Sequence, residues 1–233
     1  MRGSLSVIVP AFNEEKNIEA ALKNIYRTVK ILFKDYEVLV MNDGSVDRTK
    51  TIAEEAAKAN QKIRVINFER NAGFGAMYRA GIKMAKKKYV VMIPGDNEIM
   101  EDSILYLLKH VGKKDIIMTY ISNPEARPLL RRIMSACFTD TINVLFGLNL
   151  GYFNGMVIYE TELVQKVRMT TNSYAFQAEI LIRLLKSGCS FMELPMVVRP
   201  QRVPRTNVFR LNNIVGSFAT IAKLFLEIQV RGQ

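Results

Sequence analysis

Short apolar runs alternate with longer amphipathic stretches along the first 121 residues. Runs of strand length lie at residues 5–9, 36–41, 62–68, 89–93 and 115–121. Between them, apolar residues recur at helical spacing, which predicts helices at about 18–32, 47–59, 76–85 and 101–110. The order of strand, polar loop and helix is repeated four times. This repetition predicts an α/β fold with a mostly parallel central sheet and helices on both faces.

The pattern changes after residue 121, where Asn123-Pro124 interrupts the chain. Periodicity predicts helices at 127–148, 174–186 and 211–230, and strands at 151–159 and 189–198. Neither an internal repeat nor a low-complexity linker separates the two parts of the sequence. We therefore expect a single domain that spans residues 1–233.

Polar loops follow each of the first four predicted strands. They contain Asn13-Glu14, the segment 43–45, the segment 71–75 and the segment 96–98. Because parallel strands end at one edge of a sheet, these loops are expected to converge. That edge is where open α/β sheets bind their ligands.

The loop after the fourth strand carries two carboxylates, Asp96 and Glu98. Hard oxygen ligands of this kind suit Mg²⁺ or Mn²⁺, which complete their coordination with water and substrate phosphates. The alternative interpretation is a solvated turn, since the preceding Pro94-Gly95 is ordinary turn chemistry.

Composition narrows the function classes. The net charge of +11 favours anionic partners, but the chain has no nucleic-acid recognition motif and no nucleic-acid partner is expected. A single histidine and two cysteines argue against zinc chemistry and His-based nucleophilic catalysis, and the cysteine count favours a reducing cytosol. The first strand is followed by PAFNEE rather than a glycine fingerprint, which argues against a nicotinamide enzyme.

Four segments of the first half form a recognisable set: VIVPAFNEE at 7–15, NDGSVDRT at 42–49, NAGFGAMYRAG at 71–81 and the loop at Asp96. Together they resemble family 2 glycosyltransferases of the GT-A fold, and within them the polyprenyl-phosphate hexosyltransferases. The second half of the chain matches more loosely, through GYFNG at 151–155 and FQAEILIRLLKSG at 176–188.

The resemblance implies a nucleotide-diphosphate sugar as the donor. Residues of the first loop would line the base and ribose pocket, and Asp43 would accept hydrogen bonds from the base or ribose. The glycines would let the backbone approach the ligand. The expected donor-binding residues are Pro10, Phe12, Glu14, Asp43, Gly44, Ser45, Asn71 and Gly73.

The resemblance also implies that Asp96 and Glu98 hold a Mg²⁺ or Mn²⁺ ion that bridges the donor diphosphate. The sequence departs from the family where Pro94 replaces the usual first aspartate, and where Phe74 replaces a basic residue. Arg70 or Arg79 could substitute for that basic residue. The G-x-S-K element of the late basic loop and the Q-x-x-R-W motif of processive synthases are both absent.

Arginines in the second half favour a phosphate acceptor, because the planar guanidinium can bind two phosphate oxygens at once. Inverting transfer to a polyprenyl phosphate would need no catalytic base, whereas a hydroxyl acceptor would need one, with Glu179 or Glu98 as candidates. Glu179 could instead pair with Arg183 four residues on. The candidate acceptor-binding residues are Arg127, Arg131, Arg132, Arg202 and Arg205.

We therefore expect residues 1–122 to bind the nucleotide sugar, 123–210 to bind the acceptor, and 211–233 to form an amphipathic helix. The apolar helices at 127–148 and 211–230 are either core or membrane-seeking, and no run reaches the roughly 18 residues of a membrane span. The prediction is a cytoplasmic enzyme that binds peripherally to an anionic membrane. Two alternatives are a soluble family 2 enzyme acting on a sugar or protein hydroxyl, and an inactive binding module.

Overall fold

A computed structural model describes residues 3–200 and 211–231, which include a seven-stranded sheet of order β3-β2-β1-β4-β6-β5-β7. All of these strands run parallel except β6, which is antiparallel to both neighbours. This confirms the predicted, mostly parallel α/β sheet. The strands are β1 Leu5–Ala11, β2 Tyr36–Asn42, β3 Ile63–Asn67, β4 Tyr89–Met92, β5 Ile116–Ile121, β6 Val157–Glu160 and β7 Phe191–Met196.

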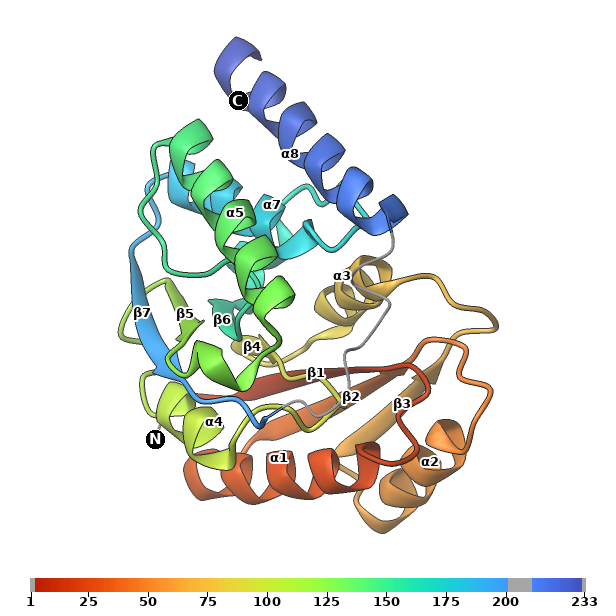
Figure 1. Ribbon diagram of the computed structural model, residues 1–233. Coiled ribbons are helices and arrows are strands. Elements are labelled where there is room, and N and C mark those ends of the chain that lie inside the picture. The colour runs from red at the N-terminus through yellow and green to blue at the C-terminus, as the bar shows by residue number, and fades with distance from the viewer. Residues whose placement is uncertain (1–2, 201–210, 232–233) are drawn as a thin grey trace.

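Helices cover both faces of the sheet (Figure 1). On one face lie α1 Ile18–Leu32, α2 Thr49–Ala59 and α4 Glu101–Leu108. On the other lie α3 Phe74–Met84, α5 Leu129–Phe146, α7 Phe176–Lys186 and α8 Leu211–Arg231. Two short elements, η1 Pro124–Ala126 and α6 Thr161–Gln165, complete the described elements.

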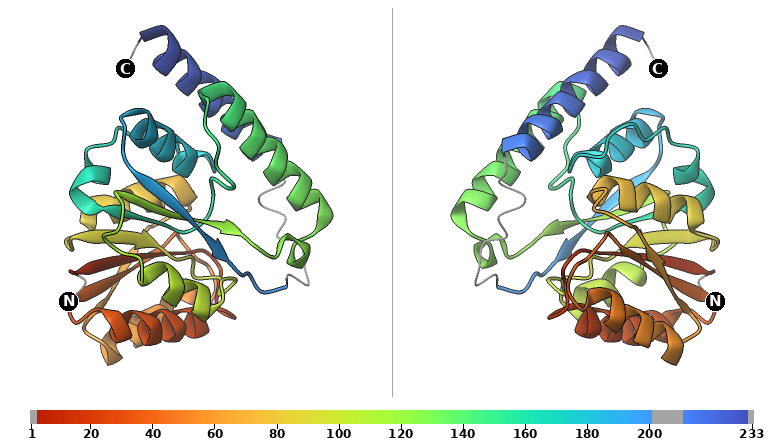
Figure 2. Two further views of the ribbon diagram at one scale, coloured as in Figure 1. Left: turned by 90° about the vertical axis from the view of Figure 1, so that its left-hand side faces the viewer. Right: turned by 90° about the vertical axis from the view of Figure 1, so that its right-hand side faces the viewer.

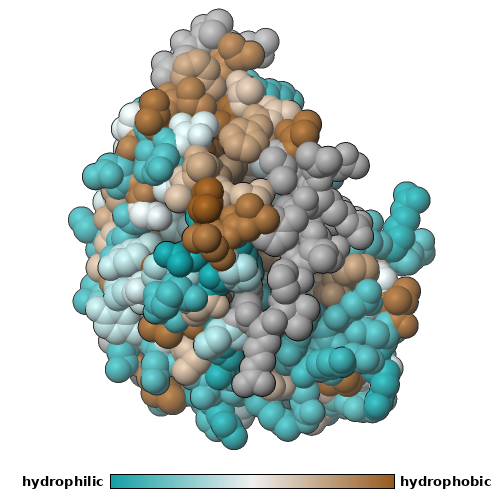
Figure 3. Space-filling model, viewed as in Figure 1, coloured by the Kyte–Doolittle hydropathy of each residue, from teal (hydrophilic) through white to brown (hydrophobic). Residues whose placement is uncertain are grey.

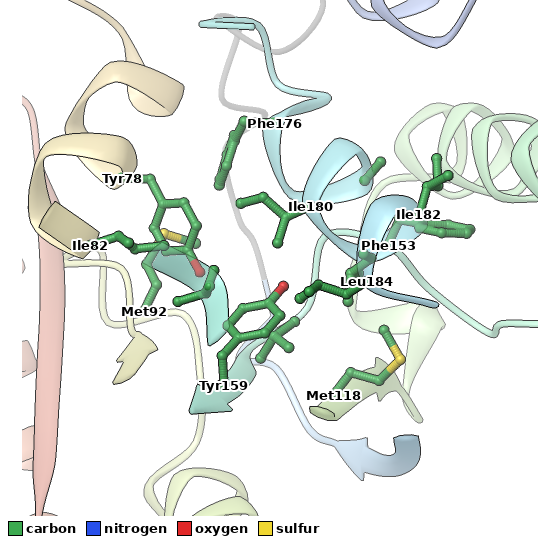
Figure 4. Packing of buried hydrophobic residues seen from close by; sticks show 14 of the residues in the cluster. Tyr78, Ile82, Met92, Met118, Phe153, Tyr159, Phe176, Ile180, Ile182 and Leu184 are labelled. Carbon is green, nitrogen blue, oxygen red and sulfur yellow. The ribbon is translucent and has the colours of Figure 1, made fainter. Parts of the chain in front are cut away.

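Alternation along the strands divides the core into two layers, because successive side chains of a strand point to opposite faces. Val7 and Val9 pack under α1, whereas Ile8 between them packs toward α3. Figure 4 shows the layer on the α3 and α7 side, where Tyr78, Tyr159 and Phe176 meet. The layers hold the strand ends in fixed positions relative to one another.

Two predicted boundaries in the second half were wrong. The strand expected at 151–159 begins only at Val157, and residues 151–156 form a loop against β5. A Cβ on Gly155 would lie 2.1 Å from the carbonyl oxygen of Thr119, so this close approach requires glycine. The helix expected from residue 127 begins at Leu129, after the turn η1, and the short helix α6 was not predicted.

The C-terminal helix α8 was predicted at 211–230, and the structure confirms a helix there. It lies beside α5, and both stand away from the sheet (Figure 2). Phe138 and Phe146 of α5 meet Phe218 and Phe225 of α8 in edge-on ring contacts. Within residues 3–200 and 211–231, no helix combines the length and apolar character that crossing a membrane requires.

Candidate functional site

A cavity of about 760 Å³ opens at the carboxyl ends of the strands, between the sheet and the pair α5–α8. Loops of the first half supply carboxylates to its lining, including Glu14, Asp43, Asp96 and Glu98, and this part is called the acidic end. Two arginines and the apolar side chains of Met134, Phe138 and Phe218 also line it, and this part is called the basic end. The two parts adjoin, since Arg131 Nη1 lies 3.8 Å from Glu98 Oε2.

The loop after β1 is tied to the loop after β2. Asn13 has a left-handed backbone with a φ of +54°; its N–H donates to Ser45 Oγ at 3.0 Å, and its side-chain oxygen accepts the N–H of Val46 at 3.0 Å. The N–H of Glu14 donates to Thr49 Oγ1 at 2.7 Å. Asn13 thus fixes one loop against another.

The loop after β2 is in turn tied to the loop after β3 through Asp43. The buried carboxylate of Asp43 accepts the backbone N–H groups of Ala72 and Gly73, at 2.7 and 3.1 Å. Each carboxylate oxygen keeps a further lone pair, and Asp43 lines the cavity. Asp43 can therefore position the third loop and still accept a hydrogen bond from a ligand.

Gly44 lets the same two loops approach each other. It has a φ of +67°, and a Cβ there would lie 2.6 Å from the carbonyl carbon of Arg70. Gly44 thus permits the close approach of the chain's own backbone at Arg70, in addition to any approach of a ligand.

Gly44→Ala is expected to destabilise the protein and to loosen the polar end of the cavity. A left-handed backbone costs an alanine about 1–2 kcal/mol, and the clash with the Arg70 backbone adds to this. Gly147→Ala is the matched control, because Gly147 has a φ of +59° but nothing within 4 Å of the added methyl. Urea unfolding should show the larger loss of stability for Gly44→Ala; equal losses would contradict the role given to the close approach.

Asp96 and Glu98 both line the cavity just beyond the end of β4. Asn97 between them has a left-handed φ of +56°, and its side-chain oxygen accepts a hydrogen bond from Asn24 at 2.9 Å. Within the described part of the chain, no group of three or more His, Cys, Asp or Glu residues forms a metal cage. Asp96 and Glu98 form a pair of carboxylates in a cavity that has space for phosphates. Such a pair fits Mg²⁺ or Mn²⁺, which are held by one or two carboxylates plus substrate phosphates.

Arg127 and Arg131 line the basic end of the cavity, next to the carboxylates, whereas Arg132 is exposed and does not line it. Arg127 is 9% exposed, and its guanidinium lies 5.7 Å from the ring centroid of Tyr152. Burial lowers the pKa of Arg127 from its ordinary value, although the nearby Tyr152 opposes that shift. Arg127 Nε is buried without a hydrogen-bond partner among the described residues. A guanidinium that lines the cavity supplies charge and planar donors of the kind that bind an anion.

Glu179 does not line the cavity. It is 1% exposed, its oxygens accept hydrogen bonds from the backbone and hydroxyl of Thr170 and from the backbone of Thr171, and Arg183 pairs with it at 3.2 Å. The structure therefore supports the pairing with Arg183 rather than the catalytic role. Arg183 also binds Glu227 at 2.7 Å, which attaches α8 to α7.

The remaining expected residues divide into three groups. Pro10 and Phe12 line the cavity, whereas Gly44, Ser45, Asn71 and Gly73 lie in the neighbouring loops without lining it. Neither Arg70 nor Arg79 is a lining residue, and Arg79 binds the carbonyl oxygen of Met169. Arg202 and Arg205 lie outside the described residues.

Several lining residues were not predicted. Asp47 lies at the polar end; burial works against its ionised form, but hydrogen bonds from Thr49 and Glu15 hold the pKa of Asp47 below its ordinary value. Tyr174 and Phe218 line the apolar part. Asp47 lies within the NDGSVDRT segment, so the resemblance could have included it, but no sequence signal brings Phe218 to the cavity.

Comparison with known proteins gives one family for most of the chain. The family model described as glycosyl transferase family 2 matches residues 6–168. A dolichyl-phosphate beta-glucosyltransferase of Trichomonas vaginalis is 29% identical over 210 residues, which are 82% of this chain and 64% of that protein. A dodecaprenyl-phosphate galacturonate synthase of Rhizobium johnstonii is 24% identical over 176 residues, which are 74% of this chain and 52% of that protein. The chain thus spans between half and two thirds of these relatives.

Solved structures of similar fold include glucosyl-3-phosphoglycerate synthase from Mycobacterium tuberculosis. Its complex with UDP has a TM-score of 0.72 and 18% identity, and covers 96% of this chain and 80% of that one. Its complex with Mn²⁺, UDP-glucose and phosphoglyceric acid has a TM-score of 0.70 and 16% identity, with coverage of 96% and 80%. The fold and the family match together show that the chain belongs to glycosyl transferase family 2 and has the GT-A fold.

Proposed function

We propose that this chain transfers a hexose, with inversion, from a GDP- or UDP-linked sugar to a polyprenyl phosphate. The observation that carries the proposal is a single cavity whose lining combines the carboxylate pair, the buried Arg127 and an apolar wall. Named relatives that use dolichyl and dodecaprenyl phosphates support the same class of acceptor.

The donor is assigned to the acidic end. Pro10, Phe12 and Glu14 would bind the base and ribose, together with Asp43. A divalent ion held by Asp96 and Glu98 would neutralise the charge that develops on the departing diphosphate. Named structures with Mn²⁺ or Mg²⁺ and UDP support the use of such an ion. The two carboxylates would also orient the diphosphate within the cavity.

The acceptor phosphate is assigned to the arginine end. Arg127 lines the cavity and would supply a guanidinium charge to the phosphate, and Met134, Phe138 and Phe218 provide apolar contacts for an isoprenoid tail. In the reaction a phosphate oxygen forms a bond to the anomeric carbon, and the bond from that carbon to the diphosphate oxygen breaks. The leaving nucleoside diphosphate takes the electron pair. The acceptor is already an anion, so no residue has to remove a proton.

The lipid acceptor requires contact with a membrane surface, and an apolar area at α5 and α8 is suited to it. Figure 3 shows apolar residues gathered on this side of the molecule. Leu129, Leu130 and Ile133 of α5 are 65%, 60% and 51% exposed, and Val215 of α8 is 63% exposed. The exposed Arg132 adds positive charge at the same helix.

Binding to anionic vesicles is expected at low salt and should weaken as salt rises, because screening shortens to about 3 Å at 1 M. The double variant Leu129→Ser with Leu130→Ser should reduce binding severalfold in a co-sedimentation assay. Ile31→Ser is the control, since Ile31 is 64% exposed on α1, on the other face of the sheet. Equal binding by both variants would contradict the proposed membrane contact.

The experiment that tests the function supplies labelled GDP- and UDP-hexoses, Mn²⁺, and vesicles that contain a polyprenyl phosphate. A labelled lipid from one of these donors is the expected product. Label that appears only in added soluble sugars, proteins or phosphorylated three-carbon acids would contradict the lipid acceptor and favour a soluble one. Absence of any product, from protein that still binds a nucleoside diphosphate, would indicate a binding module.

A further inference from the structure

The two ends of the cavity are joined by an ion pair. Arg131 Nη1 lies 3.8 Å from Glu98 Oε2. The side chains are 22% and 20% exposed, so water screens the pair only partly. One partner belongs to the carboxylate pair after β4, and the other belongs to the first turn of α5. A residue assigned to the metal thus contacts a residue assigned to the acceptor phosphate.

Bound ligands would compete for the same two charges. A divalent ion held by Asp96 and Glu98 would compete with Arg131 for Glu98. A phosphate bound by Arg131 would compete with Glu98 for Arg131. Either ligand would thus break the ion pair and free the residue that the other ligand needs.

We propose that the pair Glu98–Arg131 couples the two halves of the reaction, so that metal binding at Glu98 makes Arg131 available to the acceptor phosphate. The inference rests on the proposed function, because it assumes the metal and phosphate assignments. By linkage, the acceptor phosphate must raise the affinity for the metal by the same factor as the metal raises the affinity for the phosphate. This coupling favours binding of the acceptor phosphate after the metal-bound donor has bound. It therefore limits unproductive binding of lipid.

Metal binding by Arg131→Gln provides the first test, with free Mn²⁺ measured by electron paramagnetic resonance. Removal of the competitor should tighten Mn²⁺ binding about fivefold or more, within the usual range of coupling between sites. Arg127→Gln is the matched control, because it removes the same charge from the same end of the cavity without removing this ion pair. Equal shifts for the two variants would indicate a general field effect and overturn the inference, as would weaker binding by Arg131→Gln.

Phosphate binding without metal provides the second test, with a short-chain polyprenyl phosphate as the probe and calorimetry as the readout. Glu98→Gln should bind the probe about fivefold or more tightly than the unaltered protein in the absence of Mn²⁺. Asp96→Asn removes the same charge two residues away and should have the smaller effect. Equal effects of the two variants would overturn the inference.

The outcomes separate this inference from the proposed function. Failure of the unaltered protein to bind Mn²⁺ would overturn both the metal assignment and the coupling. Normal Mn²⁺ binding and lipid transfer, with equal shifts for Arg131→Gln and Arg127→Gln, would overturn the coupling and leave the function standing.

Discussion

Asp96→Asn is expected to remove most sugar transfer while the protein remains folded. Asparagine keeps the size of the side chain but lacks the negative charge that the divalent ion requires. Loss of an outer-shell partner of a metal already costs roughly 10- to 100-fold, so loss of a direct ligand should cost at least about a hundredfold. Transfer to lipid, measured beside thermal unfolding, checks both parts of this prediction.

Asp102→Asn is the control for Asp96→Asn, because Asp102 is exposed in the first turn of α4 and does not line the cavity. It should transfer sugar at the rate of the unaltered protein. Chelation of the ion should reproduce the defect of Asp96→Asn in the unaltered protein. Full transfer in excess EDTA would rule out the metal assignment.

Arg127→Ala is expected to impair lipid-dependent transfer far more than it impairs nucleotide binding. Removing one partner of a buried charged contact costs about 2–5 kcal/mol, which corresponds to at least about a thirtyfold loss. Arg127→Lys should restore part of the activity, since it keeps the charge without the planar fork. The measurement is the ratio of lipid transfer to nucleoside diphosphate binding, with both assayed in the same preparation of each variant.

Arg132→Ala is the matched control, because Arg132 is an arginine in the first turn of α5, just after Arg127 in the chain, but is exposed and does not line the cavity. A loss of nucleotide binding equal to the loss of lipid transfer in Arg127→Ala would indicate a general disruption of the cavity. Equal defects in the Arg127 and Arg132 variants would also contradict the acceptor role of Arg127.

Much of the fold could be predicted from the sequence, because the first half is locally consistent. Each buried strand there is a short apolar run, and α1 carries its apolar residues at regular helical spacing. The second half was less predictable because distant contacts decide it. The segment 151–156 has apolar residues suited to a strand, but the packing of Gly155 against Thr119 makes it a loop.

The acidic end of the cavity could be predicted because its residues follow the parallel strands β1, β2 and β4. Asp43 follows β2 and Asp96 follows β4, and these strands flank β1, so the parallel order brings their loops to one edge. Glu98 shares the loop of Asp96, so the carboxylate pair needed no tertiary information.

The residues of the basic end could not be predicted from the sequence in the same way. Arg131 and Arg132 are adjacent in the sequence, but the orientation of α5 places one in the cavity and the other in solvent. Glu179 has the carboxylate that a catalytic base requires, yet the loop at 170–171 and Arg183 occupy its oxygens. Phe218 reaches the cavity only because α8 packs beside α5.

The most direct test of the account compares a short-chain polyprenyl phosphate with the matching free polyprenol, at equal concentration and with the donor that supports transfer. A phosphate acceptor is already ionised and binds the buried arginine, whereas an alcohol would require a base. The account predicts metal-dependent transfer to the phosphate and none to the alcohol. Transfer to the alcohol but not to the phosphate would contradict it.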